Sequence, residues 1–259
     1  IAYDRDKTQS YGGTTALINA SLGEDANNGI AAALGYPAGT KISRDQWNGY
    51  HVPNEYVANF DLVGVDWEAT SGFGYNREKS DRRAFFYNIG GVEAYDKANV
   101  NSGWRCWKFN SRASDGTLYS TDNYSIFSSA DFPMFRLAEM YLIYAEAQAR
   151  LDGGTTTDSK AMGYIKELRD RAGMTTPSSI NLDFILKERA CELMWEGHRR
   201  TDLIRYGYFT AMSFPWPYKG GIPDGKVALP SYRTVYPLLQ SDLSENSNLV
   251  QNTGYQSNN

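Results

Sequence analysis

The sequence predicts a mainly α fold, in which a scaffold of packed helices carries long irregular loops and a few short strands. Apolar residues recur at helical spacing after residue 130, which is typical of amphipathic helices. Residues 1–130 are instead rich in Gly, Asn, Ser, Asp and aromatic rings. We therefore expect a loop-rich aromatic region over residues 1–130 that binds a ligand, and a helical region over residues 131–259, both within one domain.

The helical region is predicted to begin with a pair of helices. The first is expected over residues 132–149, with Asp131 as its N-cap and the Gly153-Gly154 pair at its end. The second is expected between an N-cap at Asp158 and a stop at Gly173. The inward-facing stripe of the first helix is expected to consist of Met134, Leu137, Ala138, Tyr141, Leu142, Ala145 and Ala149. A short loop joins the two helices, so we expect them to lie antiparallel and, through their small Ala residues, close together.

Two more helices are expected before the C-terminal tail. The longer covers residues 182–197 after Asn181 as N-cap, and the shorter covers residues 201–206 before Gly207. Four prolines between residues 215 and 230 argue against further long helices, and the tail is rich in Asn and Ser.

The first half is predicted to contain only short elements. Dipeptides such as Gly12-Gly13, Asn28-Gly29 and Gly90-Gly91 interrupt its apolar pieces. Residues 104–109 alternate loosely, which favours a strand, and Asp115-Gly116 is expected to form a turn after it. A loop layer of this size must pack against other structure, because unpaired buried backbone is costly, and the helical half is the expected support.

Composition excludes several classes of protein. The 259 residues carry 26 Lys and Arg against 30 Asp and Glu, a net charge of −4 without basic runs, so we expect no nucleic-acid partner. No segment approaches the roughly 20 consecutive apolar residues of a membrane-spanning helix. The sequence also lacks a Gly-Lys-Ser/Thr phosphate loop and a Gly-x-Ser-x-Gly nucleophile elbow.

Cysteine and histidine offer little chemistry. Cys106 and Cys191 lack the spacing of a zinc site, and Cys106 lies between two Trp residues, as a buried thiol would. His198 has no second ligand at suitable spacing, and a structural role is favoured. His51, in a turn-forming aromatic loop, is compatible with a hydrogen-bonding role in a site. We therefore expect no metal and no cofactor.

A row of three glutamates is the strongest candidate for acid–base chemistry. Glu188, Glu192 and Glu196 recur at every fourth residue of the predicted third helix and are surrounded in sequence by Arg. A glycoside hydrolase would use two such carboxylates as acid and base. Carboxylates this close also need cationic neighbours in any folded protein, so a structural ion network is the favoured interpretation.

The excess of aromatic residues in the first half indicates a sugar ligand. A pyranose offers a C–H face that stacks on a flat ring and hydroxyl groups that need amide, carboxylate or guanidinium partners. Some of these rings are also expected to form the core of the loop layer. The candidate carbohydrate-binding residues are Tyr36, Trp47, Asn48, Tyr50, Trp67, Tyr75 and Arg77.

Three stretches closely resemble the SusD/RagB family, in the family's order. They are residues 135–147 (Phe-Arg-Leu-Ala-Glu-Met-Tyr-Leu-Ile-Tyr-Ala-Glu-Ala), residues 188–205, which contain Glu-Gly-His-Arg-Arg-Thr-Asp-Leu-Ile-Arg, and residues 248–255 (Asn-Leu-Val-Gln-Asn-Thr-Gly-Tyr). Trp47-Asn48-Gly49 is in addition similar to a stretch of some starch-type members. The family's Pro-Ile-Pro-x-x-Glu is replaced here by residues 236–242, Tyr-Pro-Leu-Leu-Gln-Ser-Asp.

The resemblance implies a tetratricopeptide-like helical scaffold with long irregular loops that carry the sugar site. It implies a non-enzymatic lipoprotein on the outer surface of a Bacteroidetes outer membrane. Such a protein binds oligosaccharide or polysaccharide and delivers it to a SusC-like TonB-dependent transporter. The resemblance covers the C-terminal part of the family, so the lipid anchor, the only expected link to the membrane, and an N-terminal helical half would lie outside these residues.

Two alternatives remain open at this point. One is a helical protein-interaction scaffold, which is suggested by the helix pair, or a binder of a non-sugar nutrient such as a peptide. The other is a glycoside hydrolase that uses an Asp/Glu pair. Release of reducing ends would identify the enzyme, whereas capture of a transporter without affinity for any glycan would identify the scaffold.

Overall fold

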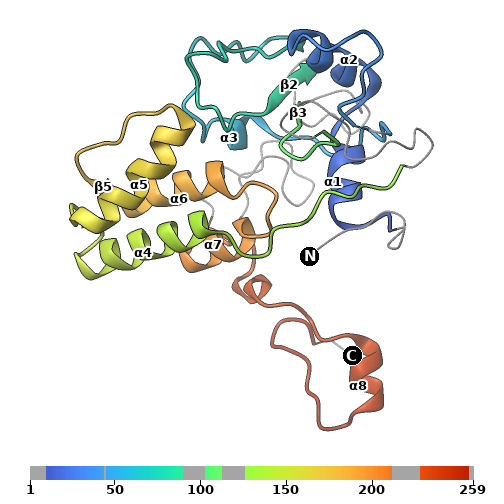
Figure 1. Ribbon diagram of the computed structural model, residues 1–259. Helices are drawn as coiled ribbons and strands as arrows, with labels where there is room; N and C mark the ends of the chain where they lie inside the picture. Colours follow the sequence, from blue (N-terminus) through green and yellow to red (C-terminus); the bar gives the residue numbers. More distant parts are fainter. Residues whose placement is uncertain (1–9, 44, 90–102, 113–125, 212–227, 257–259) are drawn as a thin grey trace. The chain divides into compact units, whose positions relative to one another are not determined.

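Three helices from the second half of the chain form the helical scaffold in the computed structural model (Figure 1). They are α4 (Leu137–Leu151), α5 (Ser159–Ala172) and α6 (Leu182–Glu192), and α4 packs against both of the others. The structure describes residues 10–43, 45–89, 103–112, 126–211 and 228–256. The mainly α fold with a helical scaffold, irregular loops and a few short strands is confirmed.

The caps expected from the sequence position α5 and α6. The Asp158 carboxylate accepts a hydrogen bond from the Ala161 N–H at 2.8 Å, and Gly173 ends α5 in the left-handed region with φ of 74°. The Asn181 side chain accepts from the Phe184 N–H at 2.8 Å at the start of α6. Two short strands, β4 (Thr155–Thr156) and β5 (Ile180–Asn181), pair antiparallel beside these starts.

Small residues on α4 bring the helices together. Ala138, Leu142, Ala145 and Ala149 are buried against α5 and α6. The rest of this cluster consists of Ala161, Ile165, Leu168, Ile180, Ile185 and Leu193. The predicted inward stripe was wrong at its beginning, because Met134 and Leu137 are more than half exposed.

One predicted helix beginning and one predicted helix end were also wrong, and both errors involve Arg136. The first helix begins at Leu137 rather than near residue 132, because Arg136 has an extended backbone and its guanidinium binds Glu192 and Glu196. The third helix ends at Glu192 rather than at residue 197. Its Glu192 carbonyl accepts hydrogen bonds from Lys108 and Arg136, which replaces continued helical bonding. The next residues turn back, with Trp195 at φ of 62°.

The first half consists of short elements, as predicted. Its helices are α1 (Gly13–Ser21), α2 (Glu24–Ala33) and α3 (Asn54–Val57). Its antiparallel sheet has the order β1 (Ser71–Gly72), β2 (Phe86–Ile89), β3 (Trp104–Cys106). The strand expected over residues 104–109 is therefore shorter than predicted, and the turn expected at residues 115–116 lies outside the described residues.

The loop-rich half packs on the helical half through a shared core. Phe86, Trp104 and Cys106 from the sheet are fully buried in one cluster with Cys191 and Met194 of the α6 region. Hydrogen bonds reinforce this packing: the Tyr56 hydroxyl donates to the Ala190 carbonyl at 2.8 Å, and the Cys191 thiol to the Asn59 carbonyl at 3.1 Å. The helical half is thus the support that the loop layer was expected to need.

The chain divides into two compact units, residues 1–197 and residues 198–259. The second contains α7 (Arg199–Arg205), the 3₁₀ helix η2 (Ser231–Thr234) and α8 (Gln240–Glu245). The predicted helix over residues 201–206 is thus α7. The boundary expected near residue 130 is a change in composition and not a division into compact units, so it stays a prediction. None of the helices described is both long and apolar enough to cross a membrane.

Within the second unit, side chains of residues 248–255, the last of the three family-like stretches, hold the tail in shape. The Gln251 side chain accepts from the Leu238 N–H at 2.8 Å and donates to the Leu238 carbonyl at 2.9 Å. The Tyr255 hydroxyl donates to the Val235 carbonyl at 3.0 Å, and its ring meets Tyr232 edge-on at 4.8 Å. A Cβ on Gly254 would lie 2.4 Å from the Tyr232 ring. These contacts close the 232–255 loop on itself.

Candidate functional site

The Trp47-Asn48-Gly49-Tyr50 loop is fixed to the C-terminal end of α1 by its backbone. The Trp47 N–H donates to the Asn19 carbonyl at 2.8 Å, and the N–H groups of Gly49 and Tyr50 donate to the Ala20 carbonyl at 2.8 and 2.7 Å. The last carbonyls of a helix have no intrahelical partners, and the N–H groups of this loop donate hydrogen bonds to them. The side chains of the loop therefore stand on a defined frame.

Trp47 contributes an exposed ring to a cluster of three. Its side chain is 38% exposed, and its indole Nε1–H donates to Asp45 Oδ2 at 2.7 Å, which fixes the ring's orientation. The Tyr11 ring, 63% exposed, lies 6.0 Å from Trp47 and 5.1 Å from Phe127 between ring centroids. We call Tyr11, Trp47 and Phe127 the aromatic patch.

Side chains of α1 hold the third segment of the aromatic patch in place. The Asn19 amide donates to the Ile126 carbonyl at 2.7 Å, and the Thr15 hydroxyl accepts from the Ser128 N–H at 3.0 Å. Residues around 11, 47 and 127 thus converge on one short helix. A ring platform assembled in this way loses little conformational entropy when a flat ligand stacks on it.

Asn48 links the aromatic loop to the sheet. Its backbone is left-handed, with φ of 52°, a conformation that Asn tolerates better than most residues. Its side-chain oxygen accepts from Arg105 Nε at 2.8 Å. Arg105 is fully buried on β3, and burial lowers the pKa of its guanidinium to about 10. Asn48 therefore serves as a hydrogen-bond partner of Arg105, and this bond occupies its side-chain oxygen.

Tyr50 stands beside a different ring. It is 44% exposed and meets Trp195 edge-on at 6.3 Å between centroids. Trp195 belongs to the turn after α6 and is half-buried against the core. His51, in the same loop, bonds through Nε2 with the Asn48 carbonyl at 3.1 Å, a structural contact.

The remaining candidate residues lie among core rings. Tyr75 is 9% exposed; its hydroxyl donates to the Ala84 carbonyl, and burial raises its pKa. Trp67 is half-buried and meets Trp104 edge-on at 6.2 Å. Arg77 lies over the Phe73 ring at 4.4 Å.

Tyr36 is partly covered as well, with the Arg112 guanidinium 5.0 Å from its ring centroid. The seven candidates thus fall in several neighbourhoods rather than one, and among them Trp47 and Tyr50 present the exposed rings. Tyr11, Phe127 and Trp195 were missed. Each is far in sequence from Trp47 and Tyr50, and no local pattern indicates that Tyr11 and Phe127 join Trp47 or that Trp195 meets Tyr50.

Glu188 and Glu192 of α6, with Glu196 in the turn after it, form the expected ion network. Glu188 binds Arg83 at 2.5 Å and Arg169 at 2.8 Å. Glu192 binds Arg136 at 2.9 Å, and burial, which raises its pKa, is outweighed by hydrogen bonds from Arg171 and Arg136 that lower it to about 2. A general acid needs a raised pKa instead, so Glu192 is suited to structure and not to proton transfer.

The described residues contain no group of three or more His, Cys, Asp or Glu side chains that could hold a metal ion. Cys106 and Cys191 are buried and unlinked, and burial raises the pKa of both thiols, to about 12 for Cys106. A thiol of raised pKa is a poor nucleophile.

Comparison with known proteins decides the family. The model of the SusD family matches residues 45–255, most of the chain. The chain belongs to the SusD family. Starch-binding protein SusD of Bacteroides thetaiotaomicron is 36% identical over 180 residues, which make up 68% of this chain and 31% of that protein. SusD-like protein P38 of Formosa agariphila is 34% identical over 47% of this chain and 24% of its own length.

Solved structures share the fold. Surface glycan-binding protein A from Bacteroides uniformis has a TM-score of 0.56 at 21% identity, over 82% of this chain and 42% of that one. A SusD superfamily protein from Bacteroides fragilis has a TM-score of 0.54 at 19% identity, over 99% and 51%. At these identities the likeness concerns the fold alone. The chain spans less than a third of the length of the curated SusD-family relatives described above.

Proposed function

We propose that this SusD-family chain binds an oligosaccharide or polysaccharide at the bacterial cell surface without cleaving it. In this proposal the protein is held to the outer membrane by a lipid and delivers its ligand to a SusC-like TonB-dependent transporter. Membership of the family and the similarity to a starch-binding protein and a surface glycan-binding protein support the class of ligand.

The observation that carries the proposal is the exposed aromatic patch. A sugar ring stacks on flat aromatic faces, and such contacts contribute about 1 kcal/mol per ring beyond the area they bury. Tyr11 and Trp47 expose their rings side by side, and Tyr50 exposes another from the same loop. The proposed site therefore uses Trp47 and Tyr50 from the sequence-based set and adds Tyr11 and Phe127.

Tyr36, Trp67, Tyr75 and Arg77 are assigned no direct contact in this proposal. Their rings and guanidinium are engaged by neighbours, and Tyr75 is a core residue. Asn48 is assigned a positioning role, because its side-chain oxygen holds Arg105.

Native affinity electrophoresis tests the proposal. We expect a gel containing starch or another polysaccharide to retard the full chain, and Trp47→Ala to weaken that retention about five- to tenfold, since one stacking ring is lost. Phe135→Ala is the matched control, because Phe135 is 81% exposed and lies outside the aromatic patch. Equal retention of Trp47→Ala and the wild type on every retarding polysaccharide would contradict the proposed site.

Turnover separates this function from the hydrolase. We expect no release of reducing ends from any polysaccharide that retards the protein, because the buried glutamates are bound to Arg and Lys. Cleavage that disappears in Glu192→Gln would instead identify an enzyme. Capture of a transporter by a protein with no affinity for any glycan would favour the interaction scaffold.

A further inference from the structure

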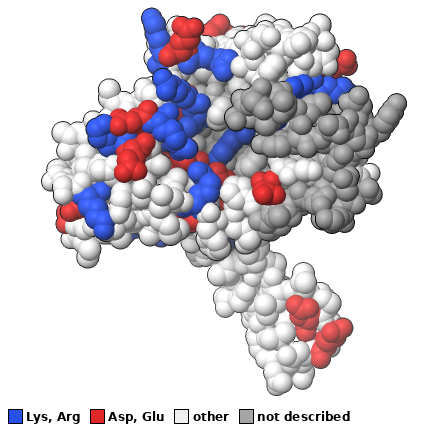
Figure 2. Space-filling view, in the orientation of Figure 1, with Lys and Arg blue, Asp and Glu red and all other residues white. Residues whose placement is uncertain are grey.

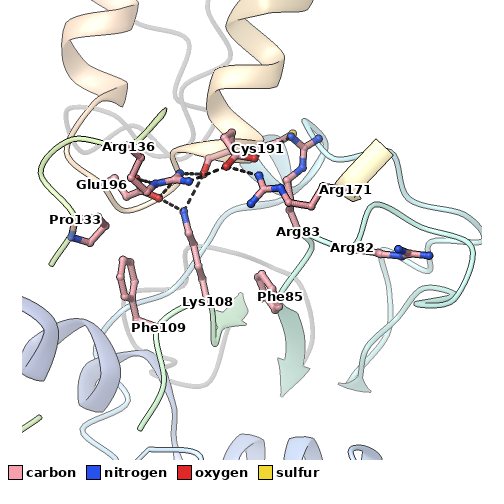
Figure 3. A pocket seen from close by; sticks show the side chains of 11 residues that line it. Arg82, Arg83, Phe85, Lys108, Phe109, Pro133, Arg136, Arg171, Cys191 and Glu196 are labelled. Atoms are coloured by element: carbon pink, nitrogen blue, oxygen red, sulfur yellow. Dashed lines mark hydrogen bonds and ion pairs between the residues drawn. The ribbon is translucent and has the colours of Figure 1, made fainter. Parts of the chain in front are cut away.

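A cavity of about 360 Å³ opens where the ion network meets the surface of the 1–197 unit (Figure 3). It lies among residues of the segment before β2, the segment after β3, the approach to α4, the end of α5 and α6. Its volume is at the small end of the roughly 300–1,000 Å³ range of ligand pockets, suited to one ring-sized group.

Cationic side chains dominate its wall. Two carboxylates, Glu192 and Glu196, line the cavity together with Arg82, Arg83, Lys108, Arg136 and Arg171. Figure 2 shows Lys and Arg side chains gathered, interspersed with Asp and Glu, on one face of the molecule. The two carboxylates are 2–3% exposed, so the negative charge is buried at the base of the network.

Most of the cations of the wall share these two carboxylates, and Arg83 is paired in addition with Asp81 and Glu188. Glu192 is contacted by Arg83, Arg136 and Arg171, at 3.4, 2.9 and 2.5 Å. Glu196 is contacted by Arg136 at 2.7 Å and by Lys108 at 2.5 Å. Burial lowers the pKa of Lys108, and although Glu196 opposes this, the charge of Arg136 adds to it. The positive charge of Arg136 thus repels that of Lys108, and an anion bound in the cavity would reduce this repulsion.

Two guanidinium groups at the cavity have capacity for a ligand. Arg82 is exposed and makes no ion pair within the part of the chain that is described; its backbone N–H donates to the Ala172 carbonyl at 3.0 Å. In Figure 3 no dashed line reaches it, and its side chain extends away from Lys108, toward the edge of the cavity. Arg171 has a 58% exposed side chain and uses one nitrogen for Glu192. A guanidinium carries five N–H donors, so several stay available on each.

Apolar surface completes the cavity. Phe85, Phe109 and Pro133 line it, and Figure 3 shows the two rings on either side of Lys108. The rings are held in place: Phe85 meets Trp107 edge-on at 5.0 Å, and Phe109 stacks near Phe132 at 6.3 Å. Flat rings beside guanidinium groups provide partners for the C–H face of a sugar and for an anionic substituent on it.

We propose that this cavity binds the anionic group of an acidic sugar unit, a carboxylate or a sulfate, with Arg82 and Arg171 as its principal donors. The inference rests on the proposed glycan binding and extends it to a second subsite, distinct in residues from the aromatic patch. Carboxylate and sulfate present the same chemistry to a guanidinium, with planar or clustered oxygens that accept paired N–H groups.

Isothermal titration calorimetry on the full chain tests this subsite. The probes are an oligogalacturonate, a sulfated galactan oligosaccharide and a neutral galactan oligosaccharide of equal length. We expect at least one acidic probe to bind more tightly than the neutral one, and Arg82→Gln with Arg171→Gln to lower that ratio of affinities about tenfold, because charge-assisted hydrogen bonds are lost. Both side chains are exposed, and Glu192 keeps its ion pairs with Arg83 and Arg136 after the substitution, so the variant is expected to fold.

Lys79→Gln is the control for general charge, since Lys79 is exposed and does not line the cavity. It is expected to leave the ratio unchanged. An acidic-to-neutral ratio that is the same in the wild type and the double variant, an equal fall in Lys79→Gln, or no preference for either acidic probe would each overturn the subsite. Trp47→Ala in the same titration with the neutral probe distinguishes failure of the aromatic patch from failure of the cavity.

Discussion

At the scale of single residues, Asn48 combines a demanding backbone conformation with a buried partner. Its φ is 52°, and its side-chain oxygen accepts from the fully buried Arg105. A hydrogen bond to a charged group contributes about 1.5–3 kcal/mol, and a left-handed backbone costs an ordinary residue about 1–2 kcal/mol. The residue at position 48 must therefore tolerate a left-handed backbone and also provide an acceptor for Arg105.

A series of substitutions at Asn48 separates these requirements. We expect Asn48→Gly to lower the free energy of unfolding by about 2 kcal/mol, because the acceptor is lost, and Asn48→Ala by about 1 kcal/mol more, because Ala is strained at this φ. Asn48→Asp, which keeps the acceptor, is expected to stay near the wild type. Urea denaturation measures all three, and equal stability of the Gly and Ala variants would contradict the backbone argument.

Residue chemistry in the sequence predicts part of this site. The exposed rings of Trp47 and Tyr50 follow from an aromatic residue beside turn-forming neighbours in a loop. Tyr75 has the same local signature and is buried, because the sheet brings it against Trp104. Tyr11 and Phe127 join Trp47 through contacts with α1, which no local pattern contains.

At the scale of elements, the end of α5 depends on Gly173. Its φ is 74°, and a Cβ there would lie 3.0 Å from Arg82 Nε, so the glycine satisfies both the helix cap and the approach of Arg82. Gly163, inside α5, has open space where a Cβ would go. The same substitution therefore has opposite consequences at two positions of one helix.

We expect Gly173→Ala to lower the free energy of unfolding by about 1–2 kcal/mol, because of backbone strain. Gly163→Ala is the matched control and is expected to raise it by about 0.5–1 kcal/mol, since Ala restricts the unfolded chain and favours helix. Thermal unfolding of the two variants measures the difference. A shift of the same sign in both would show that the cap conformation has no influence.

Helix boundaries set by a local cap were predictable from the sequence, whereas those set by distant segments were not. Asp158 and Asn181 act as N-caps within a few residues of the helices they start, so the pattern is local. The end of α6 at Glu192 depends instead on Lys108 and Arg136, which arrive from distant segments and bind its last carbonyls. Such an end requires the tertiary structure.

At the scale of the whole molecule, the ion network joins many segments of the 1–197 unit. Through Glu188, Glu192 and Glu196 it connects α6 and the turn after it with cations from residues 83, 108, 136, 169 and 171. Removing one partner from a buried ion network leaves uncompensated charge and typically costs about 3–5 kcal/mol, whereas exposed pairs contribute about 0–1 kcal/mol. The sequence predicted the network and the acidic members, but not these cationic partners.

We expect Glu192→Gln to lower the free energy of unfolding by about 3 kcal/mol at pH 7. Asp170→Asn is the control, because it removes an exposed pair with Lys166 and is expected to cost less than about 1 kcal/mol. Guanidinium chloride unfolding at fixed ionic strength measures both. Equal costs would contradict the assignment of Glu192 to a buried network.

The same carboxylate makes stability depend on pH. Its pKa is about 2 in the folded chain against an ordinary 4.5, so unfolding takes up a proton in acid. The contribution is complete above pH 4.5, falls as the pH drops towards 2, and amounts to about 3 kcal/mol. We expect Glu192→Gln to lose stability less steeply than the wild type between pH 4.5 and 2, as urea titrations at each pH would show; parallel curves would contradict this.

The central claim is that the rings of the aromatic patch bind a sugar without cleaving it, and Tyr11 tests it most directly because only the structure assigns this residue to the patch. The measurement is the calorimetric affinity of an oligosaccharide, taken from a polysaccharide that retards the protein, for Tyr11→Ala and for Phe135→Ala. Loss of one stacking ring predicts an affinity about fivefold weaker for Tyr11→Ala and near the wild-type value for Phe135→Ala. Wild-type affinity in Tyr11→Ala would contradict the account.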